Sequence, residues 1–235
     1  MKKPQLFLMH FAGGNCYSFQ FMTPLLKDFE TISLELPGRG RRINEPLLTD
    51  FNAAARDVYD QLTKKLSDGV FLIYGHSLGS YLALRVANML EKAGLAPAYL
   101  IVSGNAGPGI EDRETRYSLG EEAFIDMLQE LGGIPPELLK NKELLNFFMP
   151  ILRADFELAE KNEMIHEPAV NAPLYAIMGN EEEEAKEIAN WARFTKSTFS
   201  HEVLEGDHFF IHKHPAKVAG IIRECKNQVA LLQHP

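Results

Sequence analysis

The stretch "VFLIYGHSLGSYLALRVANML" spans residues 70–90 and contains two patterns that meet at a serine. Its first half is a short apolar run that ends at Gly75, which is typical of a buried strand. Its second half predicts a helix over 78–93, because it places apolar residues on one stripe, namely Leu78, Leu82, Val86 and Leu90. The sequence therefore predicts a sharp strand-to-helix turn at Ser77.

The same alternation of strand and helix recurs along the rest of the chain. Further short apolar runs predict strands at residues 5–10, 31–36, 98–104, 173–179 and 201–206. Helical periodicity predicts helices over 51–66 and 215–232. Continuously apolar strands that alternate with helices are typical of a sheet covered on both faces. We therefore predict an α/β fold with a mostly parallel sheet flanked by helices.

One segment interrupts this alternation. Residues 105–165 contain leucine-rich helical stretches and no strand-like run. A helical insertion of this size between two strands predicts a lid over the strand ends, where open α/β sheets bind their ligands. Ordinary crossover helices with a long loop are the alternative. We therefore divide the chain into a core of residues 1–104 and 166–235 and an all-helical lid of residues 105–165.

The composition argues against several classes of function. A length of 235 residues fits one domain, or one domain with an insertion. The net charge of −8 argues against binding to nucleic acid. No apolar run is long enough to cross a membrane, and the N-terminus lacks the cleavage pattern of a signal peptide. Two cysteines are too few for a disulfide framework, so we expect a cytoplasmic protein.

The segment Gly75-His76-Ser77-Leu78-Gly79 matches the G-x-S-x-G pattern of a nucleophile elbow. Both glycines have a steric reason, because larger side chains in so sharp a turn would collide with neighbouring backbone. Ser77 is the candidate nucleophile, and the helix that follows directs its N–H groups toward developing negative charge. The alternative is a glycine-rich turn that contains an incidental serine.

An elbow serine needs a base from late in the chain. His208 follows the predicted strand 201–206 in a Gly-Asp turn and is the candidate base. Three other histidines lie close by in the sequence, and two of them adjoin the proline that opens the last helix: His201, His212 and His214.

An acid must orient the imidazole of that base. Elbow folds commonly place the acid three residues beyond a strand-terminating glycine, and counting from Gly179 gives Glu182. Asp155 and Asp207 are the alternatives. Two backbone N–H groups complete the predicted site as an oxyanion hole. One belongs to Leu78, and the other belongs to Ala12 in the Ala-Gly-Gly turn after the first strand.

With these parts together, the chain resembles the type II thioesterases, the stand-alone editing enzymes of nonribosomal peptide and polyketide assembly lines. The resemblance runs nearly end to end and implies the α/β-hydrolase fold. The segments that carry it are "FAGG" (11–14), "LPGRGRR" (36–42), "GHSLGSYLA" (75–83), "VSGNAGP" (102–108), "LGGIPPELL" (131–139), "PILRADFELAE" (150–160) and "GDHFFI" (206–211).

The resemblance also assigns roles and shows three departures. It implies that Ser77 is the nucleophile and His208 the base, with Glu182 in place of the aspartate of the family. His10 stands where the family usually has proline, and the segment after Ser103-Gly104 lacks the usual arginine. These last two departures concern loop shape or substrate choice.

The implied activity is the hydrolysis of acyl groups from the phosphopantetheine arm of carrier proteins, by a monomer that needs no metal and no soluble cofactor. Carrier proteins are usually acidic, as this chain is, so docking requires apolar lid surface or a local basic patch. Arg39, Arg41 and Arg42 form the densest positive cluster and are candidates for docking. The alternative is that they pair with nearby carboxylates. Two other functions remain open, a serine esterase of small free esters and a non-catalytic binding module.

Overall fold

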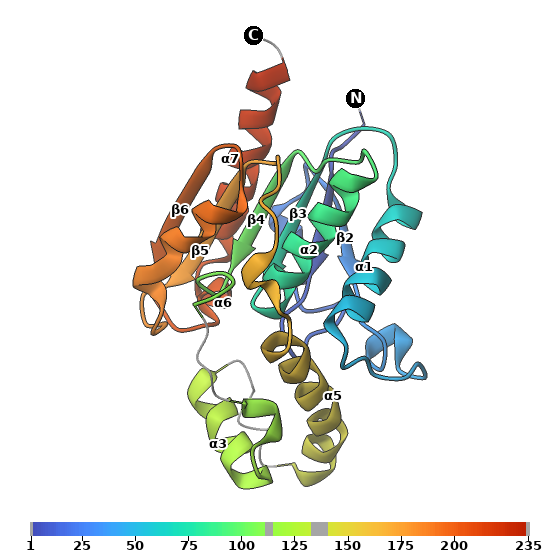
Figure 1. Cartoon of the computed structure of the whole chain (residues 1–235), viewed down its shortest axis with the longest axis vertical. Coiled ribbons are helices and arrows are strands. Elements are labelled where there is room, and N and C mark those ends of the chain that lie inside the picture. Colours follow the sequence, from blue (N-terminus) through green and yellow to red (C-terminus); the bar gives the residue numbers. More distant parts are fainter. Residues whose placement is uncertain (1, 111–114, 133–140, 234–235) are drawn as a thin grey trace.

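One sheet determines where the other elements lie. The computed structural model describes residues 2–110, 115–132 and 141–233. Six parallel strands form the sheet in the order β2-β1-β3-β4-β5-β6 (Figure 1). The strands are β1 (Gln5–Met9), β2 (Glu30–Leu34), β3 (Phe71–His76), β4 (Tyr99–Ser103), β5 (Leu174–Gly179) and β6 (Phe199–Leu204). All six predicted strands are confirmed.

Helices cover both faces of the sheet, which explains why the strands are continuously apolar. Helices α1 (Phe51–Lys65) and α2 (Leu78–Lys92) pack on the face that carries Phe7 and Ile73. Helix α7 (Pro215–Gln233) packs on the opposite face, with Leu6 and Leu72. Successive residues of a strand point to opposite faces, so each face needs its own apolar set. The predicted α/β architecture is confirmed.

The two edge strands, β2 and β6, are displaced most from their predicted bounds. Their side chains are only partly buried, whereas β1, β3 and β4 are buried throughout. Because an edge strand is covered less completely, its apolar pattern marks its ends less sharply. The short helices outside the β4–β5 connection are η1 (Thr23–Leu25), η2 (Gly40–Arg42), η5 (Ala185–Phe194) and α6 (Phe210–Lys213).

Each helix or strand that the structure describes between β4 and β5 is a helix, and loops at residues 104–110 and 167–173 join these helices to the two strands. The connection contains η3 (Arg116–Ser118), α3 (Glu121–Leu131), α5 (Lys142–Glu160) and η4 (Met164–His166). Figure 1 shows α3 and α5 at the end of the molecule opposite the two chain termini. Parts of the predicted lid, residues 111–114 and 133–140, lie outside the described residues. That this connection acts as a lid remains a prediction.

Helix α5 packs against two different partners. Leu152 and Phe156 form a small cluster with Phe124 of α3. Leu158, nearer the C-terminal end of α5, belongs to the core cluster of α1 and α2. The C-terminal part of α5 is therefore joined to the core. Across the described ranges, no helix combines the length and apolarity that crossing a membrane would need.

Candidate active site

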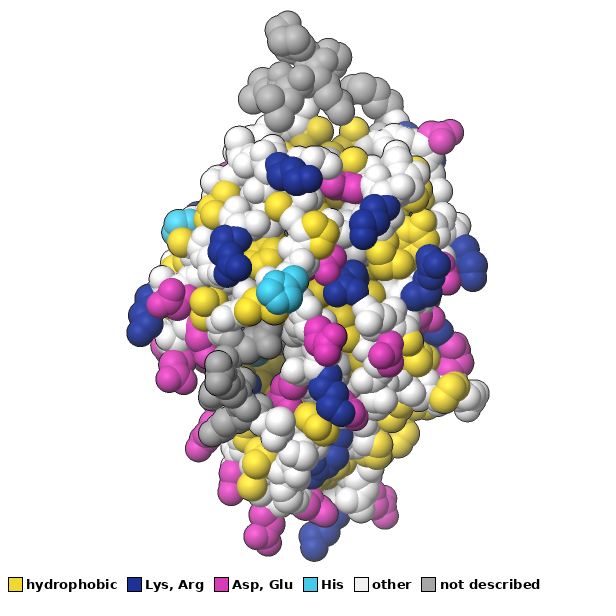
Figure 2. Space-filling view, in the orientation of Figure 1, with side chains coloured by type: hydrophobic (Ala, Val, Ile, Leu, Met, Phe, Trp, Pro, Cys, Tyr) yellow, Lys and Arg dark blue, Asp and Glu magenta, His cyan; other side chains and the backbone are white. Residues whose placement is uncertain are grey.

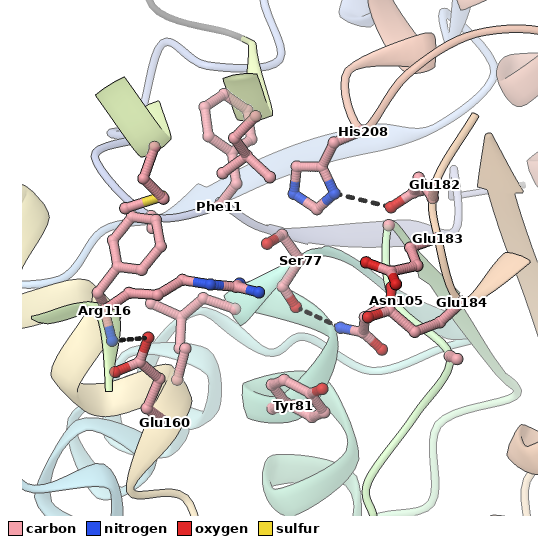
Figure 3. A pocket seen from close by; sticks show the side chains of 18 of the residues that line it. Phe11, Ser77, Tyr81, Asn105, Arg116, Glu160, Glu182, Glu183, Glu184 and His208 are labelled. Atoms are coloured by element: carbon pink, nitrogen blue, oxygen red, sulfur yellow. Dashed lines mark hydrogen bonds and ion pairs between the residues drawn. The ribbon is translucent and has the colours of Figure 1, made fainter. Parts of the chain in front are cut away.

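Ser77 lies between β3 and α2 in a backbone conformation that L-residues rarely adopt. Its φ is 56° and its ψ is −120°. Its N–H donates to the Ser103 carbonyl at 2.7 Å, and its own carbonyl accepts from Asn105 Nδ2 at 2.9 Å. Such strain persists only where neighbouring structure fixes the residue, and here the end of β4 does so. The Ser77 side chain lines a cavity (Figure 3).

The two glycines of the elbow are required by backbone contacts. A Cβ on Gly75 would lie 2.1 Å from the carbonyl oxygen of Gly79. A Cβ on Gly79 would lie 2.2 Å from the carbonyl oxygen of Met9. Both contacts are with backbone atoms, which cannot rotate away as a side chain can. This confirms the steric reason that the sequence suggested for the pattern.

We expect Gly79→Ala to lower the free energy of unfolding by about 3 kcal/mol, because overpacking a tight site typically costs about 1–3 kcal/mol and here the backbone itself must move. Gly220→Ala is the matched control, because Gly220 lies inside α7 and a Cβ there would meet nothing within 4 Å. It should raise stability by about 0.5–1 kcal/mol. Urea unfolding measures both changes, and a stable Gly79→Ala variant would contradict the steric argument.

The candidate acid and base are in direct contact. His208 Nδ1 lies 2.7 Å from Glu182 Oε2, and the two side chains are 12% and 7% exposed. The other carboxylate oxygen, Oε1, accepts from the Gly179 N–H at 2.7 Å. A carboxylate can only accept from Nδ1, so Nδ1 carries the hydrogen and Nε2 is left as an acceptor. Figure 3 shows the His208 ring beside the Ser77 side chain, within the one cavity that both residues line.

Backbone packing between two loops explains why Glu182 meets His208. A Cβ on Gly179, at the end of β5, would lie 2.4 Å from the carbonyl oxygens of both Gly206 and Asp207. The N–H of Glu181 also donates to the Gly206 carbonyl at 3.0 Å. The loops that follow β5 and β6 therefore touch through their main chains, and this contact brings the acid to the base.

The alternatives left open for the acid have other partners. Asp207 Oδ1 accepts from the Phe209 N–H at 2.8 Å. Asp155 binds Arg39 and the Gly13 N–H. Of the alternatives for the base, His214 Nε2 lies 2.7 Å from the Glu205 carbonyl. Four histidines lie close together in this part of the sequence, His201, His208, His212 and His214. Among the described residues, His208 is the only one of the four that lines the cavity with Ser77.

The cavity has a volume of about 1010 Å³ and lies between the core and the helical connection. Ala12 and Leu78, the predicted oxyanion donors, both line it beside Ser77. One wall is apolar and comes mainly from α3 and α5: Met127, Leu128, Phe148, Leu152 and Phe156. Another wall carries carboxylates from the loops after β5 and β6: Glu181, Glu183, Glu184 and Asp207. Within the described residues no cluster of His, Cys, Asp or Glu has the makings of a metal site.

A buried histidine that the sequence analysis did not assign lies beneath the site. The His76 ring is 5.2 Å from the His208 ring, centre to centre, and its Nδ1 lies 2.8 Å from Ser103 Oγ. Burial, and then the charges of His208 and His212, hold the pKa of His76 well below its ordinary value. His76 therefore stays neutral and adds no positive charge beside the candidate base.

Asn105 is a second residue without a role in the sequence analysis. Besides the bond to the Ser77 carbonyl, its Oδ1 accepts from the Gly107 N–H at 3.0 Å, and its carbonyl accepts from Trp191 Nε1 at 2.9 Å. It lies in the segment after Ser103-Gly104, where the resemblance expects an arginine. The signal that could have identified it is its position directly after β4, at the edge of the sheet where Ser77 lies.

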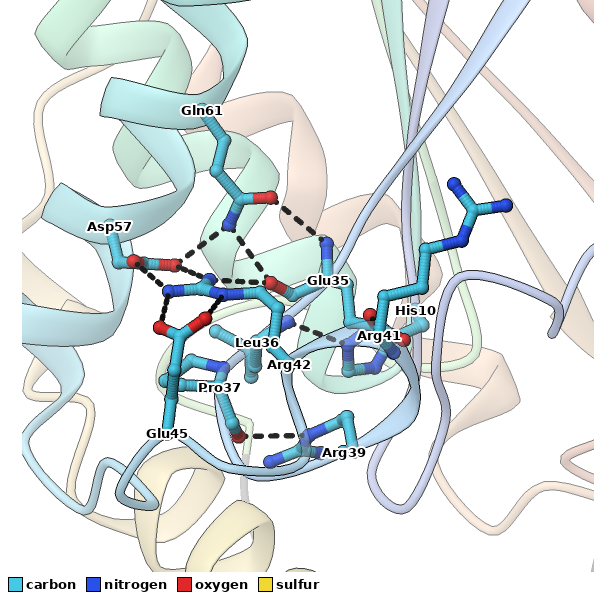
Figure 4. Close-up of polar contacts among 10 residues, drawn as sticks. All are labelled: His10, Glu35, Leu36, Pro37, Arg39, Arg41, Arg42, Glu45, Asp57 and Gln61. Atoms are coloured by element: carbon cyan, nitrogen blue, oxygen red, sulfur yellow. Dashed lines mark hydrogen bonds and ion pairs between the residues drawn. The ribbon is translucent and has the colours of Figure 1, made fainter.

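The three arginines proposed for docking have different environments (Figure 4). Arg39 is 3% exposed and makes a bidentate ion pair with Asp155, so the prediction that it docks a partner is wrong. Arg42 binds Glu45 and Asp57, and these hydrogen bonds hold the pKa of Arg42 above its ordinary value. Its charge is therefore already neutralised.

Arg41 is the exposed member of the three arginines, and its guanidinium lies 5.5 Å from the centre of the Tyr17 ring. On the face drawn in Figure 2, positive and negative side chains are interspersed rather than gathered by sign.

Comparison with known proteins adds four findings. Residues 4–227 match the thioesterase domain family. The chain is 32% identical over 231 residues to the probable anguibactin biosynthesis thioesterase AngT of Vibrio anguillarum, covering 94% of this chain and 91% of AngT. It is 31% identical over 210 residues to the thioesterase PikA5 of Streptomyces venezuelae, covering 87% of this chain and 74% of PikA5. The crystal structure of ClbQ from the colibactin NRPS/PKS pathway superposes with a TM-score of 0.91 at 27% identity, covering 98% of this chain and 100% of ClbQ.

Proposed function

The chain belongs to the thioesterase domain family and is a thioester hydrolase, and we propose that it removes acyl groups from the phosphopantetheine arms of carrier proteins. In this proposal Ser77 is the nucleophile, His208 the base and Glu182 the acid that orients the base. The observation that supports it best is the 2.7 Å contact between Glu182 and His208 in the cavity that Ser77 lines.

The proposed reaction uses these groups in turn. His208 Nε2 takes the proton as Ser77 Oγ attacks the thioester carbonyl, while Glu182 stabilises the imidazolium that forms. The N–H groups of Ala12 and Leu78 bind the oxyanion. The tetrahedral intermediate then expels the thiolate, which takes up the proton from His208 and leaves as the thiol. His208, neutral again, takes a proton from the water that attacks the acyl-enzyme and returns it to Ser77 Oγ as the acid is released, so no step requires a metal or a soluble cofactor.

The shape of the cavity supports an acyl substrate. Its apolar wall on α3 and α5 offers a surface on which an alkyl or peptidyl chain can be buried beside Ser77. AngT is named for anguibactin biosynthesis, and ClbQ comes from an NRPS/PKS pathway. We extend that context to this chain and propose carrier domains of such an assembly line as its partners.

We also propose that the protein acts as a monomer in the cytoplasm. All the proposed catalytic groups come from one chain, so no second copy is needed to complete the site. Cys16 and Cys225 are free thiols, which fits a reducing compartment.

The test is to compare kcat/KM for one acyl group presented in three ways: on a carrier protein, as a small thioester and as a small oxygen ester. We expect kcat/KM for the acyl-carrier to exceed kcat/KM for the oxygen ester by about 100-fold or more, because remote contacts with the arm and the carrier lower the transition-state energy. A preference for the ester would favour the esterase alternative. Failure of a fluorophosphonate probe to label Ser77 would favour the non-catalytic binding module.

The same assay tests the remaining docking candidate, Arg41. We expect Arg41→Glu to raise KM for the acyl-carrier about 3- to 10-fold, the size expected for one exposed charge at an interface, and to leave the small thioester unaffected. Arg56→Glu is the matched control, because Arg56 is also exposed and also lies 5.5 Å from a tyrosine ring centre, on α1. An equal rise of KM for the acyl-carrier in the two variants would show that Arg41 has no specific role in docking.

A further inference from the structure

The oxyanion hole depends on how one loop of backbone is oriented, and this inference rests on the proposed function of that loop. The N–H of Ala12 belongs to the peptide unit that begins with the Phe11 carbonyl, and the next unit ends with the N–H of Gly13. A peptide unit is planar, and none in the described chain is cis. Fixing the Phe11 oxygen and the Gly13 N–H therefore fixes the direction of the Ala12 N–H between them.

His10 fixes the first of these peptide units. The Leu36 N–H donates to His10 Nε2 at 3.3 Å, so Nε2 is the acceptor and Nδ1 carries the hydrogen. His10 Nδ1 then donates to the Phe11 carbonyl at 2.8 Å, and the Gly14 N–H donates to the same oxygen at 2.9 Å. The ring is 3% exposed. Burial, and then the charge of Arg39, lower the pKa of His10, so the neutral ring that this arrangement needs is the stable form.

Asp155 fixes the second peptide unit from a different part of the chain. Its Oδ2 accepts from the Gly13 N–H at 2.7 Å, and both of its oxygens accept from Arg39. Asp155 is fully buried, so its charge is balanced by the guanidinium and the N–H group. Gly13 itself is in close contact with α5, since a Cβ there would lie 2.6 Å from Leu152 Cδ2.

We infer that His10 and Asp155 are positioning residues that hold the Ala12 N–H toward the oxyanion by fixing the two peptide units that flank the Cα of Ala12. Asp155 lies on α5, so the helical connection supplies part of the support for the oxyanion hole as well as a wall of the cavity. Neither residue contacts the reacting atoms in this scheme. Each acts through the backbone of residues 11–13.

The test replaces each support without leaving a buried charge unpaired. The double variant Arg39→Met/Asp155→Leu removes the ion pair together with the acceptor for Gly13. His10→Ala removes the donor to Phe11, and His10→Asn restores an N–H at the position of Nδ1. We expect kcat for a small thioester to fall about 10- to 100-fold in the double variant and in His10→Ala, since a misplaced oxyanion donor costs up to that much. His10→Asn should recover to within about threefold of the parent.

Inhibitor binding separates positioning from a purely structural role. A trifluoromethyl ketone forms an oxyanion on Ser77 and so resembles the transition state. Its affinity for the variants should therefore fall by the same factor as kcat. A thioether analogue of the substrate forms no oxyanion, and its Kd should stay within about twofold of the parent. Val218→Ala controls for lost stability, since Val218 is buried on α7 against the far face of the sheet.

Three outcomes would overturn the inference while leaving the proposed function intact: unchanged kcat in the variants, equal weakening of both inhibitors, or kcat losses that Val218→Ala reproduces at the same melting temperature. If the double variant does not fold, the comparison of His10→Ala with His10→Asn decides the matter through the same two inhibitors. A folded parent protein that hydrolyses no thioester would instead refute the proposed function.

Discussion

Replacing Ser77 by alanine is expected to lower kcat for thioester hydrolysis by about 10⁴-fold or more, the loss typical when a triad nucleophile is removed. The substitution deletes one oxygen and leaves the elbow intact, because within the described residues the hydrogen bonds at Ser77 are made by its backbone. KM should change little, since the cavity walls are untouched. Mass spectrometry of an acyl-loaded carrier measures the loss of the acyl group directly.

Ser118→Ala is the control for this variant. Ser118 is an exposed serine on η3, and among the described residues its hydroxyl bonds within its own turn, to the carbonyl and the hydroxyl of Thr115. It should retain full activity. The parent protein should in addition show a transient acyl adduct on Ser77. Retention of more than about 1% of the activity by Ser77→Ala would place the nucleophile elsewhere, because the other triad members cannot replace it.

The fold could be predicted because strands and helices leave different periods in the sequence. The four inner strands are covered on both faces, so each reads as a continuous apolar run with clear ends. The edge strands β2 and β6 are covered less completely, and their predicted ends were up to two residues off. The apolar pattern of a sequence reflects which residues are buried. The predicted ends of a strand are therefore less precise where the strand is only partly buried.

The contact between Glu182 and His208 could be predicted because it depends on local geometry. Gly179 ends β5 against the backbone of Gly206 and Asp207. Counting from the end of a strand therefore locates a side chain in space. Their catalytic roles remain predictions.

The roles of Arg39 and Asp155 could not be predicted from the sequence. They are 116 residues apart and meet only because α5 packs against the loop after β2. A cluster of arginines in a sequence suggests a positively charged docking surface, because the sequence does not show which carboxylates pair with them in the fold. For the same reason Asp155 could only be considered as an acid for the triad, and its bond to Gly13 had no signal in the sequence.

Glu182→Gln is expected to lower kcat by about 10³- to 10⁴-fold, comparable to the loss seen when a triad carboxylate becomes an amide. The amide keeps the size of the side chain and can still accept from Gly179 through its oxygen. Its NH₂ group must then face His208 and donate to Nδ1. The ring would take the other tautomer, with the hydrogen on Nε2, and could not accept the proton of Ser77. Glu187→Gln, an exposed glutamate on η5, should leave kcat unchanged.

Glu182→Asp tests whether the length of the side chain matters in addition to its carboxylate. Aspartate keeps the charge but is shorter by one methylene, while the loop is held in place by the contacts of Gly179 with the β6 loop. It cannot bind the Gly179 N–H and reach His208 at 2.7 Å together without moving that loop. We expect kcat to fall about 10- to 100-fold, between the parent and Glu182→Gln, because misplacement of about 1 Å costs that much. If Glu182→Gln retained the parent kcat, the acid would not be Glu182, and the 2.7 Å contact would have only a structural role.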